Sequence, residues 1–165
     1  MSELIRIPRD DWSLVLLPRP ARPEEAVALS ELAFRSKAHW GYDAEFLQAC
    51  RGELTLTADF IEAKEVRLLE NGERALGFYS LVPWNSDVEL GHFFVDPDYI
   101  GQGIGLVLWN DAVARAVVLG YRRLIIESDP NAEEFYSKLG AERIGEVPSR
   151  VQAGRFLPLL FYPLR

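Results

Sequence analysis

Residues 95–105 read VDPDYIGQGIG, and they are the most informative stretch of this sequence. Apolar residues lead into the stretch like a strand, closely spaced glycines follow, and a helix-like apolar run begins inside them. Glycine reaches backbone conformations that other residues avoid, and it lets a ligand approach the main chain closely. The first turn of a helix offers unpaired N–H groups at the positive end of its dipole, so phosphate is the ligand that such a turn fits best.

Two better-known phosphate-binding motifs do not match this turn. The Rossmann pattern GxGxxG would need glycine at Leu106, and the P-loop would need Gly-Lys-Ser/Thr, which the chain lacks. From the glycines alone, a purely structural turn is as good an interpretation as a ligand site.

The segments on both sides of the turn alternate between helix-like and strand-like patterns. Before the turn, the expected elements are a strand at Ser13–Leu17, a helix from Pro23 to about Phe34, a helix at Tyr42–Ala49 stopped by Gly52, a short helix from Thr57, and strands at Glu65–Leu69, Ala75–Val82 and Asp87–Val95. After the turn, they are a helix at Gly103–Gly120, a strand at Arg122–Glu127, a helix at Asn131–Leu139, and strands at Ala141–Val147 and Phe156–Tyr162. This order predicts an α/β (α+β) fold, in which Asn71-Gly72 makes a hairpin turn.

A second motif lies downstream, where residues 131–140 read NAEEFYSKLG. Together with V-x-P-x-x-x-G-x-G-x-G, it resembles the GNAT superfamily of N-acetyltransferases. That family's turn reads Arg/Gln-x-x-Gly-x-Gly/Ala, and its later helix reads Asn-x-x-Ala-x-x-Phe-Tyr-x-x-x-Gly-Phe. The resemblance is strong from about Ala75 to Ala141. It implies one GNAT-like domain over residues 1–165, with a mixed, mostly antiparallel central sheet of about six to seven strands and helices on both faces.

The resemblance implies acetyl-coenzyme A (acetyl-CoA) as co-substrate and no metal. The residues that it assigns to the coenzyme are Phe94, Val95, Ile100, Gly101, Gln102, Gly103, Ile104, Gly105, Asn131 and Phe135. A backbone N–H near Phe94 and Val95, where the strand would splay from its neighbour, would hold the thioester carbonyl. The chain departs from the family pattern at three positions. Ile100 stands where the family prefers Arg or Gln, Ala141 replaces a phenylalanine, and Asn131 directly precedes the alanine of the motif.

Acetyl transfer to an amine needs a base and an acid, because an aliphatic ammonium with a pKa of about 10 cannot attack and a thiolate must leave. Tyr136 matches the tyrosine that the family uses as the proposed acid; the alternative is an aromatic core residue. Glu89 is the first candidate for the base and His92 the second, whereas a surface salt bridge and a structural histidine are the alternatives. Strict strand alternation would put these two side chains on opposite faces, unless a bulge at Gly91 intervenes.

The segment between the first two expected helices reads SKAHWGY over residues 36–42. In the family this connection covers the acceptor pocket, so the resemblance implies acceptor contacts from His39, Trp40 and Tyr42. A helix hairpin whose aromatic side chains cap the core is the alternative. Arg150 and Arg155, near the last loop, would meet coenzyme phosphates, an acceptor carboxylate or solvent.

Composition narrows the class of partner. The chain has 25 acidic and 18 basic residues in 165, a net charge of -7, which argues against nucleic acid and weakly favours a cationic acceptor. Cys50 is the only cysteine, so no intrachain disulfide can form, and two histidines offer no metal-ligand spacing. No apolar run approaches the roughly 18 residues that span a membrane, and the start MSELIRIPRD lacks a signal-peptide pattern. We therefore expect a cytoplasmic protein without membrane contact.

These features predict an N-acetyltransferase that moves the acetyl group of acetyl-CoA to a primary amine of a small molecule or peptide, by direct attack in a ternary complex. A non-catalytic acyl-CoA-binding or sensor module is the first alternative, and it would bind coenzyme A (CoA) without ever releasing it from acetyl-CoA. A structural α/β domain is the second, and it would bind no coenzyme. The sequence does not identify the acceptor, and it leaves a homodimer open because dimers are frequent in the family.

Overall fold

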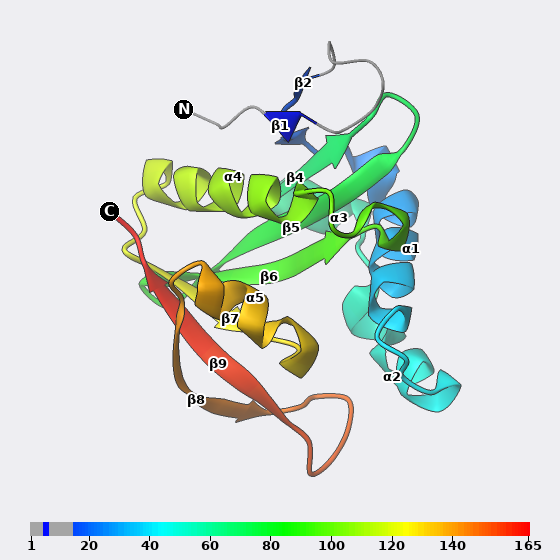
Figure 1. Cartoon of the computed structure of the whole chain (residues 1–165), viewed down its shortest axis with the longest axis vertical. Coiled ribbons are helices and arrows are strands. Elements are labelled where there is room, and N and C mark those ends of the chain that lie inside the picture. Colours follow the sequence, from blue (N-terminus) through cyan, green and yellow to red (C-terminus); the bar gives the residue numbers. More distant parts are fainter. Residues whose placement is uncertain (1–4, 7–14) are drawn as a thin grey trace.

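The computed structural model of the chain describes residues 5–6 and 15–165, and its centre is a seven-stranded sheet (Figure 1). The strand order is β3-β4-β5-β6-β7-β9-β8. The strands are β3 (Arg19–Pro20), β4 (Glu65–Glu70), β5 (Ala75–Trp84), β6 (Asp87–Val95), β7 (Arg123–Glu127), β8 (Glu142–Pro148) and β9 (Phe156–Pro163). Strands β6 and β7 pair in parallel, whereas the other neighbours in this sheet are antiparallel. The predicted mixed, mostly antiparallel sheet is therefore confirmed.

A separate two-stranded ribbon pairs β1 (Ile5–Arg6) with β2 (Val15–Leu16). Strand β2 falls within the predicted strand Ser13–Leu17. The first two residues of that prediction lie outside the described part of the chain.

Helices follow the predicted order with shifted ends. They are α1 (Ala26–Ala38), α2 (Ala44–Leu54), α3 (Ala58–Ala63), α4 (Ile104–Val118) and α5 (Glu133–Lys138). Short 3₁₀ turns precede three of them, namely η1 (Pro23–Glu25), η2 (Pro97–Tyr99) and η3 (Pro130–Ala132). None of the helices in the described part of the chain is long and apolar enough to cross a membrane.

The predicted range of α2 is wrong at both ends. The side chain of Asp43 accepts a hydrogen bond from the Phe46 N–H, so the helix begins after Asp43 rather than at Tyr42. The helix also continues through Gly52 to Leu54, because Leu54 is buried against the core and this packing outweighs the low helix propensity of one glycine.

Two separate clusters of buried side chains lie on the two faces of the sheet. One gathers under α4 and α5 and includes Leu108, Trp109 and Tyr136. The other gathers under α1, α2 and α3 and includes Leu29, Phe46 and Phe78. Helices therefore cover both faces of the sheet, as predicted (Figure 1).

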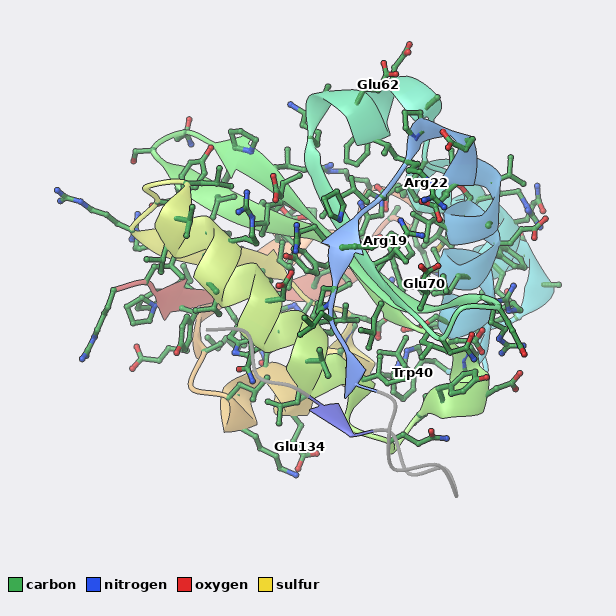
Figure 2. All side chains as sticks on the ribbon, turned by 90° about the horizontal axis from the view of Figure 1, so that it is seen from above. Arg19, Arg22, Trp40, Glu62, Glu70 and Glu134 are labelled. Carbon is green, nitrogen blue, oxygen red and sulfur yellow. The ribbon has the colours of Figure 1, made fainter. Side chains whose placement is uncertain are left out.

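The short edge strand β3 is held by ion pairs of Arg19. Its guanidinium lies 2.8 Å from a Glu25 carboxylate oxygen and 2.9 Å from one of Glu70 (Figure 2). Because Glu25 belongs to η1 and Glu70 ends β4, these bonds fix the entry to α1 against the sheet. The position of α1 matters for the site described next.

Candidate active site

A cavity opens where β6 and β7 diverge. These two strands pair at Val88↔Leu124 and Glu89↔Ile125, and their pairing stops there. Beyond that point a cavity of about 710 Å³ is lined by residues 90–95 of β6 and by residues 126–129, which end and follow β7. Backbone N–H and C=O groups on this edge of β6 thus face the cavity instead of a neighbouring strand. This geometry agrees with the expected splay near Phe94 and Val95.

A β-bulge at Gly91 decides which side chains enter the cavity. Ser80 pairs with His92 while Leu81 pairs with Leu90, so Gly91 is the extra residue. A Cβ at this position would lie 2.9 Å from Ser80 Oγ, which leaves room for glycine only. The predicted bulge is confirmed.

The bulge also reverses the side-chain alternation of β6. Leu90 before it and Phe93 and Val95 after it all belong to the cluster under α4. Glu89 and His92 therefore share the opposite face, and both line the cavity. Strict alternation, which would separate these two side chains, is wrong here because one extra residue shifts the period.

Glu89 offers an unpaired carboxyl group. In the described part of the chain it makes no hydrogen bond and no ion pair. Burial raises the pKa of this carboxyl, and the negative charge of Glu127 raises it further. A carboxylate in this state is a stronger base than an exposed one, which suits proton removal.

His92 is held by neighbours on several sides. Its Nδ1 lies 2.7 Å from Ser80 Oγ, and its ring packs against Phe60 and Phe78 at centroid distances of 5.3 and 5.9 Å. Burial lowers the pKa of His92, although a hydrogen bond with the backbone of Glu53 opposes this effect. The ring is thus neutral and tethered at neutral pH, so it is less free to take a proton than Glu89.

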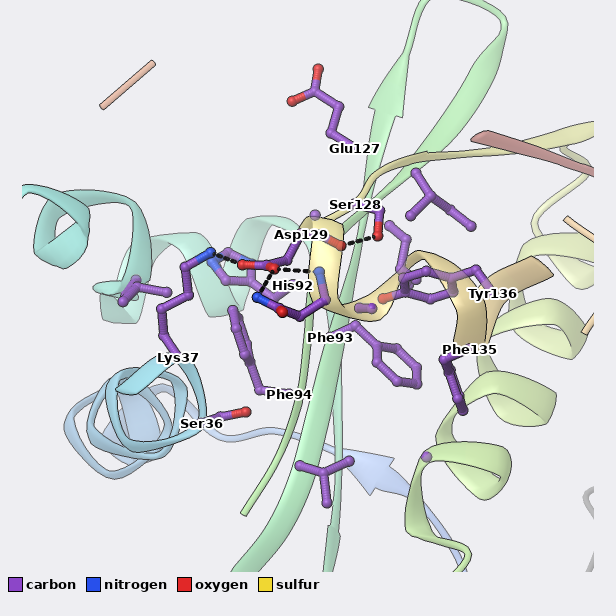
Figure 3. A pocket seen from close by; sticks show the side chains of 18 of the residues that line it. Ser36, Lys37, His92, Phe93, Phe94, Glu127, Ser128, Asp129, Phe135 and Tyr136 are labelled. Atoms are coloured by element: carbon purple, nitrogen blue, oxygen red, sulfur yellow. Dashed lines mark hydrogen bonds and ion pairs between the residues drawn. The ribbon is translucent and has the colours of Figure 1, made fainter. Parts of the chain in front are cut away.

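Tyr136 points into the cavity from α5 (Figure 3). The residue is 5% exposed, and its ring packs edge-on against Phe93 and Phe135 at 5.8 and 5.3 Å. Its hydroxyl has no hydrogen-bond partner among the described residues. Burial raises the pKa of Tyr136, and the charge of Asp129 adds to the effect. The phenol therefore keeps its proton and has it free to donate.

The glycine turn has the backbone that the sequence predicts. Gly101 and Gly103 have φ values of +82° and +83°, which other residues rarely adopt. Gly103 is also the N-cap of α4 and leaves the helix without a side-chain cap, so the N–H groups of its first turn stay available to a ligand. At Gly105 a Cβ would lie 3.2 Å from the Phe135 ring, which shows how closely α4 and α5 approach each other.

Nearly all residues assigned to the coenzyme line this one cavity. Those that do are Phe94, Val95, Ile100, Gly101, Gly103, Ile104, Gly105, Asn131 and Phe135. Gln102 is not among the lining residues. Ile100 is 48% exposed at the cavity edge, where it offers an apolar surface instead of the charge or amide that the family prefers.

A polar network that we call the Asp129 cluster closes one side of the cavity. Its members are Lys37, Tyr42, Asp129, Asn131 and Arg155. The Asp129 carboxylate accepts from Lys37 Nζ at 2.5 Å (Figure 3). It also accepts from the Tyr42 hydroxyl at 2.9 Å and from Asn131 Nδ2 at 2.9 Å. Arg155 Nη2 donates to the Tyr42 hydroxyl at 2.8 Å. The cluster thus joins α1, the α1–α2 connection, the turn before α5 and the start of β9.

The three residues predicted to contact the acceptor are in different positions. Trp40 is 45% exposed and lines the cavity. Tyr42 belongs to the Asp129 cluster and is not among the lining residues. His39 is exposed, contacts Trp40 at a centroid distance of 5.6 Å, and is not among the lining residues.

Sequence reasoning missed four charged residues that line the cavity, namely Lys37, Glu53, Glu127 and Asp129. A signal existed for two of them. Glu127 and Asp129 lie at the carboxyl end of a short apolar strand that pairs in parallel, which is where α/β proteins place functional groups. Asp129 also precedes Pro130, and a carboxylate followed by proline is typical of a helix N-cap. Lys37 gave no comparable signal. Across residues 5–6 and 15–165, no three His, Cys, Asp or Glu side chains gather as metal ligands would.

Comparison with known proteins gives a family match over most of the chain. The model of the acetyltransferase (GNAT) domain matches residues 28–158. A search of curated proteins found no match.

Solved structures share the fold at low sequence identity. A GCN5-related N-acetyltransferase from Rhodopseudomonas palustris superposes with a TM-score of 0.76 at 22% sequence identity. The superposition covers 89% of this chain and 94% of the Rhodopseudomonas chain. The PaiA N-acetyltransferase of Thermoplasma acidophilum, solved in complex with coenzyme A, has a TM-score of 0.73 at 16% identity, with 91% and 99% covered. The ribosomal-protein-S18-alanine N-acetyltransferase of Escherichia coli has a TM-score of 0.66 at 14% identity, with 90% and 94% covered.

Proposed function

The chain belongs to the GNAT acetyltransferase family, and from this premise we propose that it transfers the acetyl group of acetyl-CoA to a primary amine of a small molecule or peptide. Attack is direct, within a ternary complex. The observation that carries this proposal is a pair of unpartnered groups at the opening between β6 and β7. The Glu89 carboxyl and the Tyr136 hydroxyl both line that opening without a partner in the described part of the chain.

Each step of the reaction has a candidate group on this chain. Glu89 takes a proton from the acceptor ammonium, and His92 is the second candidate for this role. The amine nitrogen then attacks the thioester carbon, whose oxygen is held by a backbone N–H of β6 near Phe94 and Val95. As the carbon–sulfur bond breaks, Tyr136 donates its proton to the departing sulfur.

The glycine turn is the proposed binding site for the pyrophosphate of the coenzyme. Gly101, Gly103 and the first-turn N–H groups of α4 supply a cradle without a side-chain charge, since Ile100 contributes none. Asn131 and Phe135 border the same cavity. That one of the similar structures contains coenzyme A supports this assignment.

The acceptor contacts are assigned to Trp40, which lines the cavity, and to Tyr42 and His39, which neighbour it in the chain but are not among the lining residues. The Escherichia coli structure named for acetylating the alanine of a ribosomal protein supports a peptide N-terminus as one acceptor class. Small amines remain the other class.

Thermal unfolding with and without saturating acetyl-CoA tests the coenzyme site, with NAD and ATP as controls. Ligand at about a hundred times its dissociation constant stabilises the folded state by roughly 2.7 kcal/mol, which raises the melting temperature by several degrees. A rise with acetyl-CoA alone supports the proposal and justifies a screen of amines for CoA release. An unchanged melting temperature in all three ligands would contradict it.

Two glycine variants sharpen this experiment. Gly101→Ala forces an alanine to a φ of +82° and should reduce the rise caused by acetyl-CoA. Gly52→Ala is the control, because a Cβ there meets no atom within 4 Å and the residue lies inside α2. That variant should keep the full rise and be more stable by about 0.5–1 kcal/mol.

A further inference from the structure

The carboxyl groups of Glu89 and Glu127 belong to one face of the opened sheet. Glu89 pairs with Ile125 in the parallel register of β6 and β7, and Glu127 lies two residues farther along β7. Residues two apart on a strand share a face, so Glu127 projects to the same side as Glu89. Both line the cavity.

Glu127 has one weak countercharge. Arg150 Nη2 lies 3.9 Å from Glu127 Oε1, and the arginine side chain is 74% exposed whereas the glutamate side chain is 24% exposed. A pair at this distance, with one partner in solvent, neutralises little of the carboxylate. The charge of Glu127 therefore acts on Glu89 across the opening of the sheet.

The other charged groups of the cavity have partners of their own or act on the Glu89 carboxyl more weakly than Glu127 does. They are Glu53 of α2, His92 of β6, Lys37 of α1, and Asp129 and Arg155 of the Asp129 cluster. Lys37 Nζ and Arg155 Nη2 lie 2.5 and 3.8 Å from Asp129 Oδ2, so the Asp129 carboxylate largely neutralises their charges. His92 is tethered to Ser80, and Glu53 is exposed on α2.

We propose that Glu127 is a positioning residue for proton transfer, which acts on the Glu89 carboxyl through its negative charge and is opposed by the cation of Arg150. The inference rests on the proposed function, in which Glu89 takes the proton of the acceptor. A neighbouring carboxylate makes Glu89 hold a proton more tightly, so Glu89 becomes a stronger base for an ammonium. Arg150 lies on a loop and weakens this effect. The charges of Glu127 and Arg150 therefore change the basicity of Glu89 in opposite directions.

The direction of the pKa shift agrees with this arrangement. Burial raises the pKa of Glu89 most, the charge of Glu127 raises it further, the charge of Arg150 lowers it, and the charge of Glu53 raises it least. Loss of the Glu127 charge should therefore lower the pKa of Glu89, and loss of the Arg150 charge should raise it.

Direct titration tests the proposal without knowledge of the acceptor. We would label the full-length protein with ¹³C-glutamate and follow the side-chain carboxyl resonances by NMR from pH 3 to pH 8. The Glu89 signal is the one that disappears in Glu89→Gln. In Glu127→Gln its midpoint should fall by roughly 0.5 pH unit, and in Arg150→Gln it should rise by a smaller amount, because the arginine is largely exposed.

Control variants separate charge from structure. Glu127→Asp keeps the charge and should restore most of the original midpoint. Glu142→Gln, an exposed position on β8 outside the cavity, should leave the midpoint unchanged. Opposite shifts in Glu127→Gln and Arg150→Gln would support the proposal, whereas an unchanged midpoint or shifts of the same sign would overturn it.

Activity then distinguishes this inference from the proposed function. Once an amine that releases CoA is found, the acidic limb of kcat/KM should move in the same direction as the NMR midpoint in each variant. If Glu89→Gln keeps full activity, the base assignment fails, even where the titration supports the coupling. If Glu89→Gln is inactive but the titration midpoint of Glu89 is unchanged in Glu127→Gln and Arg150→Gln, the inference alone fails.

Discussion

Individual polar groups at the cavity differ in whether they have partners. Asp129 accepts several hydrogen bonds and His92 is tethered, whereas the Tyr136 hydroxyl and the Glu89 carboxyl have none within the described residues. Among the described residues no fully buried side-chain N or O atom lacks a hydrogen-bond partner, so these two groups reach the open cavity, where a ligand can bond to them. We therefore expect the most direct effects on catalysis at these two positions.

Tyr136→Phe should lower kcat about 100-fold while leaving folding stability nearly unchanged. The phenol hydroxyl makes no hydrogen bond among the described residues, so its removal costs the folded state little, but the departing sulfur then lacks its proton donor. Steady-state CoA release and urea unfolding measure the two effects. Tyr162→Phe is the matched control and should keep full activity. The Tyr162 ring packs on Trp109 at a centroid distance of 5.1 Å, and Tyr162 is not among the lining residues. A Tyr136→Phe enzyme of normal kcat would exclude the acid role.

The cavity exists because β6 and β7 stop pairing after Glu89 and Ile125. Two paired positions fix their start, and the bulge at Gly91 then brings Glu89 and His92 to one face. The glycine is required because Ser80 Oγ would lie 2.9 Å from a Cβ, and that hydroxyl also holds His92.

Gly91→Ala should destabilise the protein by about 1–3 kcal/mol. It should also lower kcat/KM under conditions where the variant is fully folded, so that loss of folded protein does not account for the decrease. Overpacking against Ser80 must shift β5 or β6, which displaces Glu89 from the opening. Gly145→Ala, at a strand position where a Cβ meets nothing within 4 Å, should change stability by less than about 0.5 kcal/mol. Urea unfolding of both variants, with assays at a temperature where each is folded, makes the comparison. Equal behaviour of the two would show that the bulge has no special role.

At the scale of the whole molecule, the Asp129 cluster links parts of the chain that are far apart in sequence. Lys37 and Asp129 are separated by 92 positions, and Arg155 and Tyr42 by 113. Burial would raise the pKa of Asp129, but the hydrogen bond and charge of Lys37, helped by Asn131 and Tyr42, outweigh it and hold the pKa below its ordinary value of 3.8.

Asp129→Asn should therefore reduce stability at pH 7 by about 2 kcal/mol, with a gap to the wild type that narrows in acid. A carboxyl whose pKa is lowered by folding contributes its full stability above the ordinary value of 3.8, and the contribution is lost as the pH falls through the lower folded value. Urea unfolding at pH 7, 5, 4 and 3 measures the gap. In the control Asp98→Asn, whose carboxyl is 74% exposed, the change should stay near 0.5 kcal/mol or below. A gap for Asp129→Asn that stays constant with pH would contradict the prediction.

Local patterns predicted most elements, because the residues that decide them are close in the chain. The hairpin at Asn71-Gly72, the glycine turn and the bulge at Gly91 all depend on backbone conformations or spaces that glycine supplies. The predicted end of α2 was wrong because burial of Leu54, a tertiary contact, extends the helix past Gly52. His39 was assigned to the acceptor by its place in a loop, although the structure leaves it outside the cavity lining.

The sequence by itself determined the order of the elements, the glycine turn at the start of α4 and the family, since each depends on motifs within about ten consecutive residues. Only the tertiary structure decided that Glu89 and His92 share a face, that Glu127 projects to that same side of the sheet, and that Lys37 contacts Asp129. The physical reason is that these contacts join residues of different strands and helices. Their proximity depends on strand register and on one inserted residue, and a shift of register by a single position would turn every side chain of β6 to the other face.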